Sequence, residues 1–278
     1  MYKSVQFLLI TIALLVIQNA FAEDATYSIE EVSYKNLVAE LYLPKSTKAV
    51  PVVIAFGGSE GGIGTGKANG EMIAPHGVAV LALAYFDAPG ISKTLDQIPL
   101  EYFLDAIDYV ATHKRINVNR IGVVAGSRGS EAAFLMASLD KRIKSVVVTT
   151  PSKVAWYGMT KARSAWTYQN KDIPALSLGL SKEAKLIDRF SVALNDEKKS
   201  NEAQFNFEEI NGPILLISAE HDQVWPSYKM SNDIKAYLES LNFKHAVIHN
   251  AYKTGHGFSQ ETAPEIKLSI INHFVKTL

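Results

Sequence analysis

The serine at position 127 has the surroundings that turn a hydroxyl group into a nucleophile. A β-branched run, Ile121–Val124, leads into Ala125–Gly129, and a helix-like pattern begins at Glu131. A strand, a sharp turn and a helix in this order form a nucleophile elbow, which exposes the serine Oγ at the tip of the turn. The pattern G-x-S-x-G is altered only at its first position, where Ala125 adds one methyl group. The motif predicts attack on a carbonyl carbon, given a base and an oxyanion hole nearby.

The acid that would orient the base has two candidates. In chains with this elbow, the acid and then the histidine follow the serine. The predicted strand Ile143–Thr149 is followed by no carboxylate, whereas the predicted strand Ile214–Ser218 is followed by Glu220 and Asp222. Both carboxylates stay open on these grounds, although the shorter side chain of Asp222 would hold an imidazole more rigidly.

His256 is the histidine best placed to act as the base. It lies in the glycine-flanked segment Thr254–Gly257, between a predicted last strand at Ala246–His249 and a predicted last helix at Pro264–Lys276. The other histidines precede the serine, adjoin the acid, bracket a strand or lie in the last helix. The order serine, acid, histidine therefore predicts a catalytic triad.

An oxyanion hole needs two backbone N–H groups directed at the developing negative charge. One is expected from Arg128, the residue after the nucleophile. The other is expected from Gly58 or Ser59, in the glycine-rich turn that follows the predicted strand Ala49–Phe56.

Nucleotide and metal chemistry are not predicted. The segment Gly64–Lys67 approaches a phosphate-binding loop, but Ala68 replaces the hydroxyl residue that would bind Mg²⁺. The histidines are scattered and cysteine is absent, so the pattern offers no metal-binding constellation and no thiol nucleophile. We expect no cofactor.

The elements around these residues predict an α/β fold, in which a mostly parallel sheet carries helices on both faces. The further predicted strands are Val38–Tyr42 and Val78–Tyr85. The segment Leu100–His113 predicts an amphipathic helix, because its apolar residues recur at a spacing of three and four.

The first residues predict a signal peptide. Lys3 precedes an apolar run at Phe7–Ile17, and Ala20-Phe21-Ala22 has the small-x-small pattern of a cleavage site. We expect cleavage near Ala22, a single domain at 23–278, and export to the periplasm or the exterior, with retention as an anchor left open. The chain carries 28 basic and 28 acidic side chains, so nothing predicts capture of nucleic acid or of an anionic membrane.

The region 151–212 interrupts the alternation of strands and helices and predicts a cap over the carboxyl ends of the strands, where sites of open α/β sheets lie. Three tryptophans, Trp156, Trp166 and Trp225, are candidates for lining an acyl pocket.

Four segments carry a resemblance to a known family: Ile98–Phe103, Ser127–Gly129, Ser164–Tyr168 and Gly212–Ser227. Together they resemble the catalytic domain of the acyl-CoA thioester hydrolase / bile acid-CoA:amino acid N-acyltransferase family, within the α/β-hydrolase superfamily. The resemblance extends from about residue 50 to residue 258. It implies a Ser-Asp-His triad at Ser127, Asp222 and His256, and so favours Asp222 over Glu220.

These expectations converge on a serine hydrolase of a small-molecule acyl thioester or ester. A serine nucleophile favours hydrolysis over transfer to an amine, because its acyl-enzyme is an ordinary ester that is open to water. Two alternatives stay open. One is an exported carboxylesterase, peptidase or amidase that does not act on coenzyme A, and the other is a non-catalytic binding module of the same fold.

Overall fold

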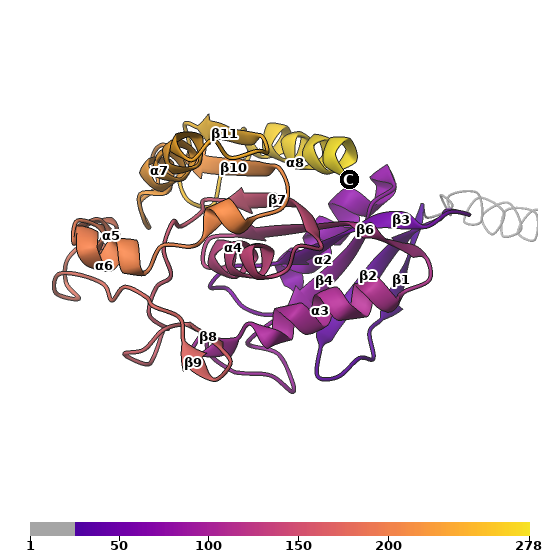
Figure 1. Ribbon diagram of the computed structural model, residues 1–278, viewed down its shortest axis with the longest axis horizontal. Helices are drawn as coiled ribbons and strands as arrows, with labels where there is room; N and C mark the ends of the chain where they lie inside the picture. The colour runs from indigo at the N-terminus through magenta and orange to yellow at the C-terminus, as the bar shows by residue number, and fades with distance from the viewer. Residues whose placement is uncertain (1–25) are drawn as a thin grey trace, which may run out of the picture.

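The computed structural model describes residues 26–278, so the predicted signal peptide at 1–22 lies outside the described residues. An eight-stranded sheet with the order β1-β2-β4-β3-β6-β7-β10-β11 forms the centre of the molecule (Figure 1). Its strands are β1 (Tyr27–Glu31), β2 (Val38–Pro44), β3 (Val50–Phe56), β4 (Ala79–Ala84), β6 (Ile116–Gly126), β7 (Ile143–Thr149), β10 (Ile214–Ala219) and β11 (Val247–Tyr252).

The sheet is parallel from β4 to β11 and antiparallel only where β2 pairs with β1 and β4. Strand β3 is buried along its whole length, as expected for a parallel strand that is covered on both faces. Its side chains alternate between two cores, since Ile54 and Phe56 pack on one face and Val53 and Ala55 on the other.

Helices cover both faces, which confirms the predicted fold class. The core on one face receives side chains from α3 (Glu101–Thr112), α4 (Gly129–Leu139) and α7 (Ser227–Ser240). The core on the other face receives them from α2 (Gly64–Ile73) and α8 (Ala263–Thr277). The helices α3 and α4 lie on the same side of the sheet in Figure 1.

No helix was predicted for α2, whose sequence contains three glycines, residues of poor helix propensity. Tertiary packing explains the helix. Gly70 lies against the ring of Tyr42, where a Cβ atom would come within 2.5 Å of the ring Cγ. The small residues therefore let α2 lie close to the sheet, and this packing overrides their poor helix propensity.

The segment between β7 and β10 stands apart from the sheet and is called the cap here (residues 150–213) (Figure 1). It contains β8 (Trp166–Tyr168), β9 (Lys171–Asp172), α5 (Leu186–Leu194) and α6 (Glu197–Glu202). Strand β8 also pairs with β5 (Ile98–Pro99), which ties the cap to the chain before α3. Within residues 26–278, none of the helices combines the length and apolar character that a membrane span needs.

Candidate active site

Ser127 lies at the tip of a strained turn between β6 and α4. Its φ angle is +50°, a left-handed conformation that non-glycine residues adopt at an energetic cost. Its backbone N–H donates to the Thr149 carbonyl at 2.9 Å, which fixes the turn to the neighbouring strand. Gly129 lies so close to Gly57 that a Cβ atom would come within 2.0 Å of the Gly57 oxygen. The glycine of the motif is therefore required by close backbone approach, whereas Ala125 fits in the core at the first position.

The structure brings the three side chains of the predicted triad into contact. The Oγ of Ser127 lies 2.9 Å from Nε2 of His256. Nδ1 of the same ring lies 3.0 Å and 2.9 Å from the two carboxylate oxygens of Asp222. Both distances are within hydrogen-bond range, so the ring can accept the serine proton on one nitrogen while Asp222 orients the other.

The Asp222 carboxylate is buried, with a side chain only 2% exposed, and several donors surround it. Its Oδ1 accepts from the backbone N–H groups of Val224 at 2.9 Å and Trp225 at 3.2 Å. Its Oδ2 accepts from the Ser227 hydroxyl at 2.6 Å. Donors of this kind fix the orientation of the carboxylate toward the imidazole. Sequence reasoning missed Ser227, which lies five residues after the acid at the start of α7.

The triad depends on three strands of the sheet. Ser127 follows β6, Asp222 follows β10, and His256 follows β11. Strands β10 and β11 pair in parallel up to Ala219 and Tyr252, so the loops that carry the acid and the base leave the sheet side by side. Residues far apart in the chain therefore meet at the carboxyl ends of the strands, as is usual in open α/β sheets.

The predicted oxyanion donors differ in whether their backbone N–H groups already have a hydrogen-bond acceptor. Arg128 is the N-cap residue of α4, where a backbone N–H has no acceptor within the helix. The Gly58 N–H donates to the Glu60 carboxylate at 2.9 Å, so it is already occupied. Ser59 lines the same cavity as Ser127 and Arg128. Of the two residues predicted from the glycine-rich turn, Ser59 is therefore the better candidate for the second donor.

A buried ion pair links the nucleophile helix to the cap. Arg128 Nε lies 2.5 Å from the Glu131 carboxylate, whose side chain is fully buried. Glu131 also accepts from the backbone N–H of Trp156 at 2.9 Å and from the indole N–H of Trp166 at 2.8 Å. The Arg128 guanidinium in turn donates to the Tyr157 carbonyl at 3.1 Å. Burial raises the pKa of Glu131, although Arg128 and these donors oppose the shift.

Two cavities adjoin Ser127. The larger one, called the cap pocket here, has a volume of about 610 Å³ and lies between Ser127 and the cap. Trp156 and Trp225, two of the three tryptophans considered as candidates for an acyl pocket, line this cavity. Trp166 does not line it; its ring packs beside Phe103, and its N–H is bound to Glu131.

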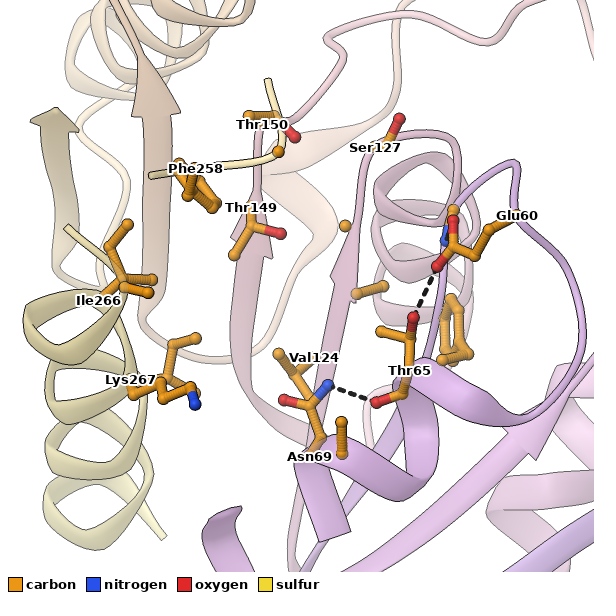
Figure 2. A pocket seen from close by; sticks show the side chains of 18 of the residues that line it. Glu60, Thr65, Asn69, Val124, Ser127, Thr149, Thr150, Phe258, Ile266 and Lys267 are labelled. Carbon is orange, nitrogen blue, oxygen red and sulfur yellow. Dashed lines mark hydrogen bonds between the residues drawn. The ribbon is translucent and has the colours of Figure 1, made fainter. Parts of the chain in front are cut away.

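The second cavity lies between α2 and α8 and has a volume of about 400 Å³. Figure 2 shows Ser127 at one end of this pocket and Asn69 and Lys267 toward the other. Glu60 and Thr65, joined by a hydrogen bond of 2.6 Å, lie along its wall. Both cavities have the size of small-molecule sites.

The described part of the chain contains no group of three or more His, Asp or Glu side chains arranged to hold a metal ion. The candidate site thus consists of the triad, two backbone N–H groups and the adjoining cavities.

Comparison with known proteins identifies a family. Residues 98–276 match the family described as "BAAT / Acyl-CoA thioester hydrolase C terminal". The chain is 28% identical over 225 residues to acyl-coenzyme A thioesterase 5 of Mus musculus, covering 78% of this chain and 51% of the relative. It is also 28% identical over 196 residues to acyl-coenzyme A amino acid N-acyltransferase 2 of Mus musculus, covering 70% and 46%. The chain spans about half the length of these relatives.

The fold is also that of solved structures with little sequence identity. An esterase from Pyrobaculum calidifontis superimposes with a TM-score of 0.62 at 15% identity, covering 99% of this chain and 94% of the esterase. This agreement supports the α/β-hydrolase fold. The match over residues 98–276 shows that the chain belongs to the BAAT / acyl-CoA thioester hydrolase C-terminal family.

Proposed function

We propose that this protein is a serine hydrolase of carboxylic thioesters or esters. The observation that carries the proposal is the continuous contact from Ser127 through His256 to Asp222, with distances of 2.9 Å at both links. The family supports the same chemistry, since acyl-coenzyme A thioesterases are among the relatives.

In the acylation step, the Ser127 Oγ attacks the carbonyl carbon while His256 Nε2 takes the hydroxyl proton. Asp222 keeps the imidazole in the required tautomer and stabilises its charged form. The N–H groups of Arg128 and Ser59 bind the oxyanion of the tetrahedral intermediate. His256 then gives its proton to the leaving thiol or alcohol, and the carbon–sulfur or carbon–oxygen bond breaks.

In the deacylation step, water attacks the ester of the acyl-enzyme. His256 takes a proton from the water, and a second tetrahedral intermediate forms in the same oxyanion hole. The collapse of this intermediate breaks the bond to Ser127, which recovers its proton from His256. The products are a carboxylic acid and the free enzyme.

Acyl-coenzyme A and simple esters are both candidate substrates. The relatives favour coenzyme A thioesters. The signal-peptide pattern leads us to propose export, and an exported enzyme would meet other esters or amides instead. Turnover of a fatty acyl-CoA, a short-chain p-nitrophenyl ester and a peptide anilide, measured side by side, separates thioesterase, carboxylesterase and peptidase activity.

The variant Ser127→Ala tests whether the chain is a serine hydrolase at all. We expect kcat for the best of these substrates to fall by at least about 10³-fold, because the nucleophile is removed. Ser138→Ala, which removes a hydroxyl from the same helix away from the site, serves as the matched control. Equal turnover by the wild type and Ser127→Ala would rule out Ser127 as the nucleophile, and no turnover by either protein would favour the non-catalytic binding module.

A further inference from the structure

The cap pocket has a one-sided charge. Four basic side chains line it, those of Arg128, Lys161, Lys182 and Arg189, and no Asp or Glu belongs to the described residues that line it. The whole chain, by contrast, has equal numbers of basic and acidic residues. The lining of this cavity is therefore more positive than the chain as a whole.

Two of the four cations are already engaged. Arg128 is paired with Glu131, and the Lys161 ammonium approaches the Gln97 amide oxygen at 3.4 Å. The Asp96 carboxylate holds the loop at Lys161 by accepting its backbone N–H at 2.9 Å. The Asp96 carboxylate is buried, and its oxygens already accept hydrogen bonds from donors of this loop.

The other two cations, Lys182 and Arg189, form no ion pair with residues 26–278. Nε of Arg189 is buried and has no hydrogen-bond acceptor. The exposed Glu183 interacts only weakly with Arg189, since its pKa is lowered mainly by a hydrogen bond with Ser181 and least by Arg189. A buried guanidinium N–H without an acceptor costs free energy unless a ligand supplies one.

We propose that the cap pocket binds an anionic group of the substrate, a carboxylate or a phosphate, through Arg189 and Lys182. This inference rests on the proposed hydrolase function, because Ser127 opens into the same cavity and fixes where the scissile carbonyl must lie. A guanidinium suits both ligands, since its planar N–H groups match two oxygens at once.

The apolar walls strengthen this interaction. Trp156, Phe190 and Trp225 line the cavity beside Arg189 and are almost fully buried. Such walls exclude water and lower the local dielectric, so that an anion gains more from each charge. A neutral substrate would leave the Arg189 N–H group without an acceptor. The pocket therefore selects against neutral substrates as well as for anionic ones.

The anionic group can belong to either of two parts of the substrate, and each position predicts a different substrate. A carboxylate would lie at the far end of the acyl group, whereas a phosphate would belong to the leaving group. Matched pairs of substrates distinguish them. Mono-p-nitrophenyl glutarate against p-nitrophenyl pentanoate varies the acyl end, and pentanoyl-CoA against pentanoyl-pantetheine varies the leaving group.

The test is the ratio of kcat/KM for the anionic over the neutral member of each pair. We expect at least one ratio to exceed ten in the wild type and to fall about tenfold in Arg189→Gln, the effect of one charged hydrogen bond. Arg189→Lys should retain part of the ratio, and Lys182→Gln should lower it less. Lys198→Gln, which removes a cap charge outside the pocket, should retain the wild-type ratio. A high ratio for the glutarate pair identifies a carboxylate, and one for the coenzyme A pair identifies a phosphate.

Ratios near one in the wild type, or ratios that Arg189→Gln and Lys182→Gln leave unchanged, would overturn the anion site while the hydrolase function stands. If the wild type hydrolyses none of the four substrates, the hydrolase function itself fails. Titration with glutarate and with coenzyme A, followed by tryptophan fluorescence, then decides the anion site alone. Binding that Arg189→Gln weakens supports the site, and no binding of either probe overturns it.

Discussion

The Glu131 carboxylate lies 2.5 Å from the Arg128 guanidinium, and the Glu131 side chain has no contact with solvent. The same carboxylate accepts hydrogen bonds from Trp156 and Trp166 of the cap. One buried acid thus connects the residue after the nucleophile with two parts of the cap, so that the elbow and the cap cannot move independently.

Replacing this acid should destabilise the protein strongly. Glu131→Gln leaves the buried Arg128 without its counter-charge, and breaking such a pair by removing one partner costs about 3–5 kcal/mol. Urea unfolding gives the change in the free energy of unfolding. Glu197→Gln, at an exposed position in α6, should stay within about 0.5 kcal/mol of the wild type. Equal midpoints for the two variants would contradict this account of the ion pair.

Ser227→Ala should impair turnover while the fold stays intact. The hydroxyl donates to Asp222 at 2.6 Å, and a hydrogen bond to a charged group is worth about 1.5–3 kcal/mol. We expect kcat for a p-nitrophenyl ester to fall roughly tenfold or more with little change in KM, because Asp222 orients the base and does not bind the substrate. Ser240→Ala, at the other end of α7, is the control. A fall in KM alone would argue against this role.

Gly129→Ala should disrupt the elbow. The added Cβ would lie 2.0 Å from the Gly57 oxygen, a distance that requires the backbone to move. We expect a lower Tm and loss of esterase activity, since the displaced turns carry Ser127 and the oxyanion donors. Gly64→Ala adds the same methyl group where nothing lies within 4 Å, and it should leave both measurements unchanged. A wild-type Tm in Gly129→Ala would show that the close approach can relax.

The stability of the fold should decrease in mild acid because of His273. Burial lowers the pKa of this side chain from 6.5 to about 4. Between these values the unfolded chain binds a proton that the folded chain excludes. The free energy of unfolding therefore falls as the pH drops from 6.5 to 4, by up to roughly 3 kcal/mol from this group. Urea unfolding across this range should give a smaller pH dependence for His273→Gln, and an identical dependence would assign the effect to other groups.

Expression with an intact N-terminus should give an exported protein that begins at Glu23. The pattern Ala20-Phe21-Ala22 is the basis of this expectation. Intact-mass spectrometry of the periplasmic or secreted fraction measures the cleavage site. Ala20→Arg and Ala22→Arg should block processing, and a full-length mass in the wild type would favour an uncleaved anchor.

The sequence best predicted the structural features that depend on neighbouring residues or on the order of elements along the chain. The apolar runs located the strands from β2 to β4 and the strands that carry the triad, although not β1. The order of a serine, a carboxylate and a histidine along the chain predicted a triad, and the resemblance to the family favoured Asp222 over Glu220 as its acid. Periodicity also located α3, expected at Leu100–His113 and observed at Glu101–Thr112. Each of these signals is local or follows from the order of the strands.

Interactions that depend on distant packing were out of reach. Helix α2 forms because Gly70 fits against Tyr42, and nothing near Gly70 in the sequence indicates this contact. The position of Trp166 was missed for the same reason, since its partner Glu131 is 35 residues away. Likewise, the choice between Gly58 and Ser59 depends on the side-chain conformation of Glu60.

The position of β11 has a further consequence. It is the last strand in the order of the sheet and pairs with β10 alone, yet His256 follows it. Segments with fewer supporting contacts open at a lower free energy than the centre of a fold. Ser127, in contrast, follows β6, which pairs on both sides. Local opening of the edge strand β11 would separate His256 from Ser127 while most of the sheet stays folded. Activity would therefore be lost before the rest of the sheet unfolds.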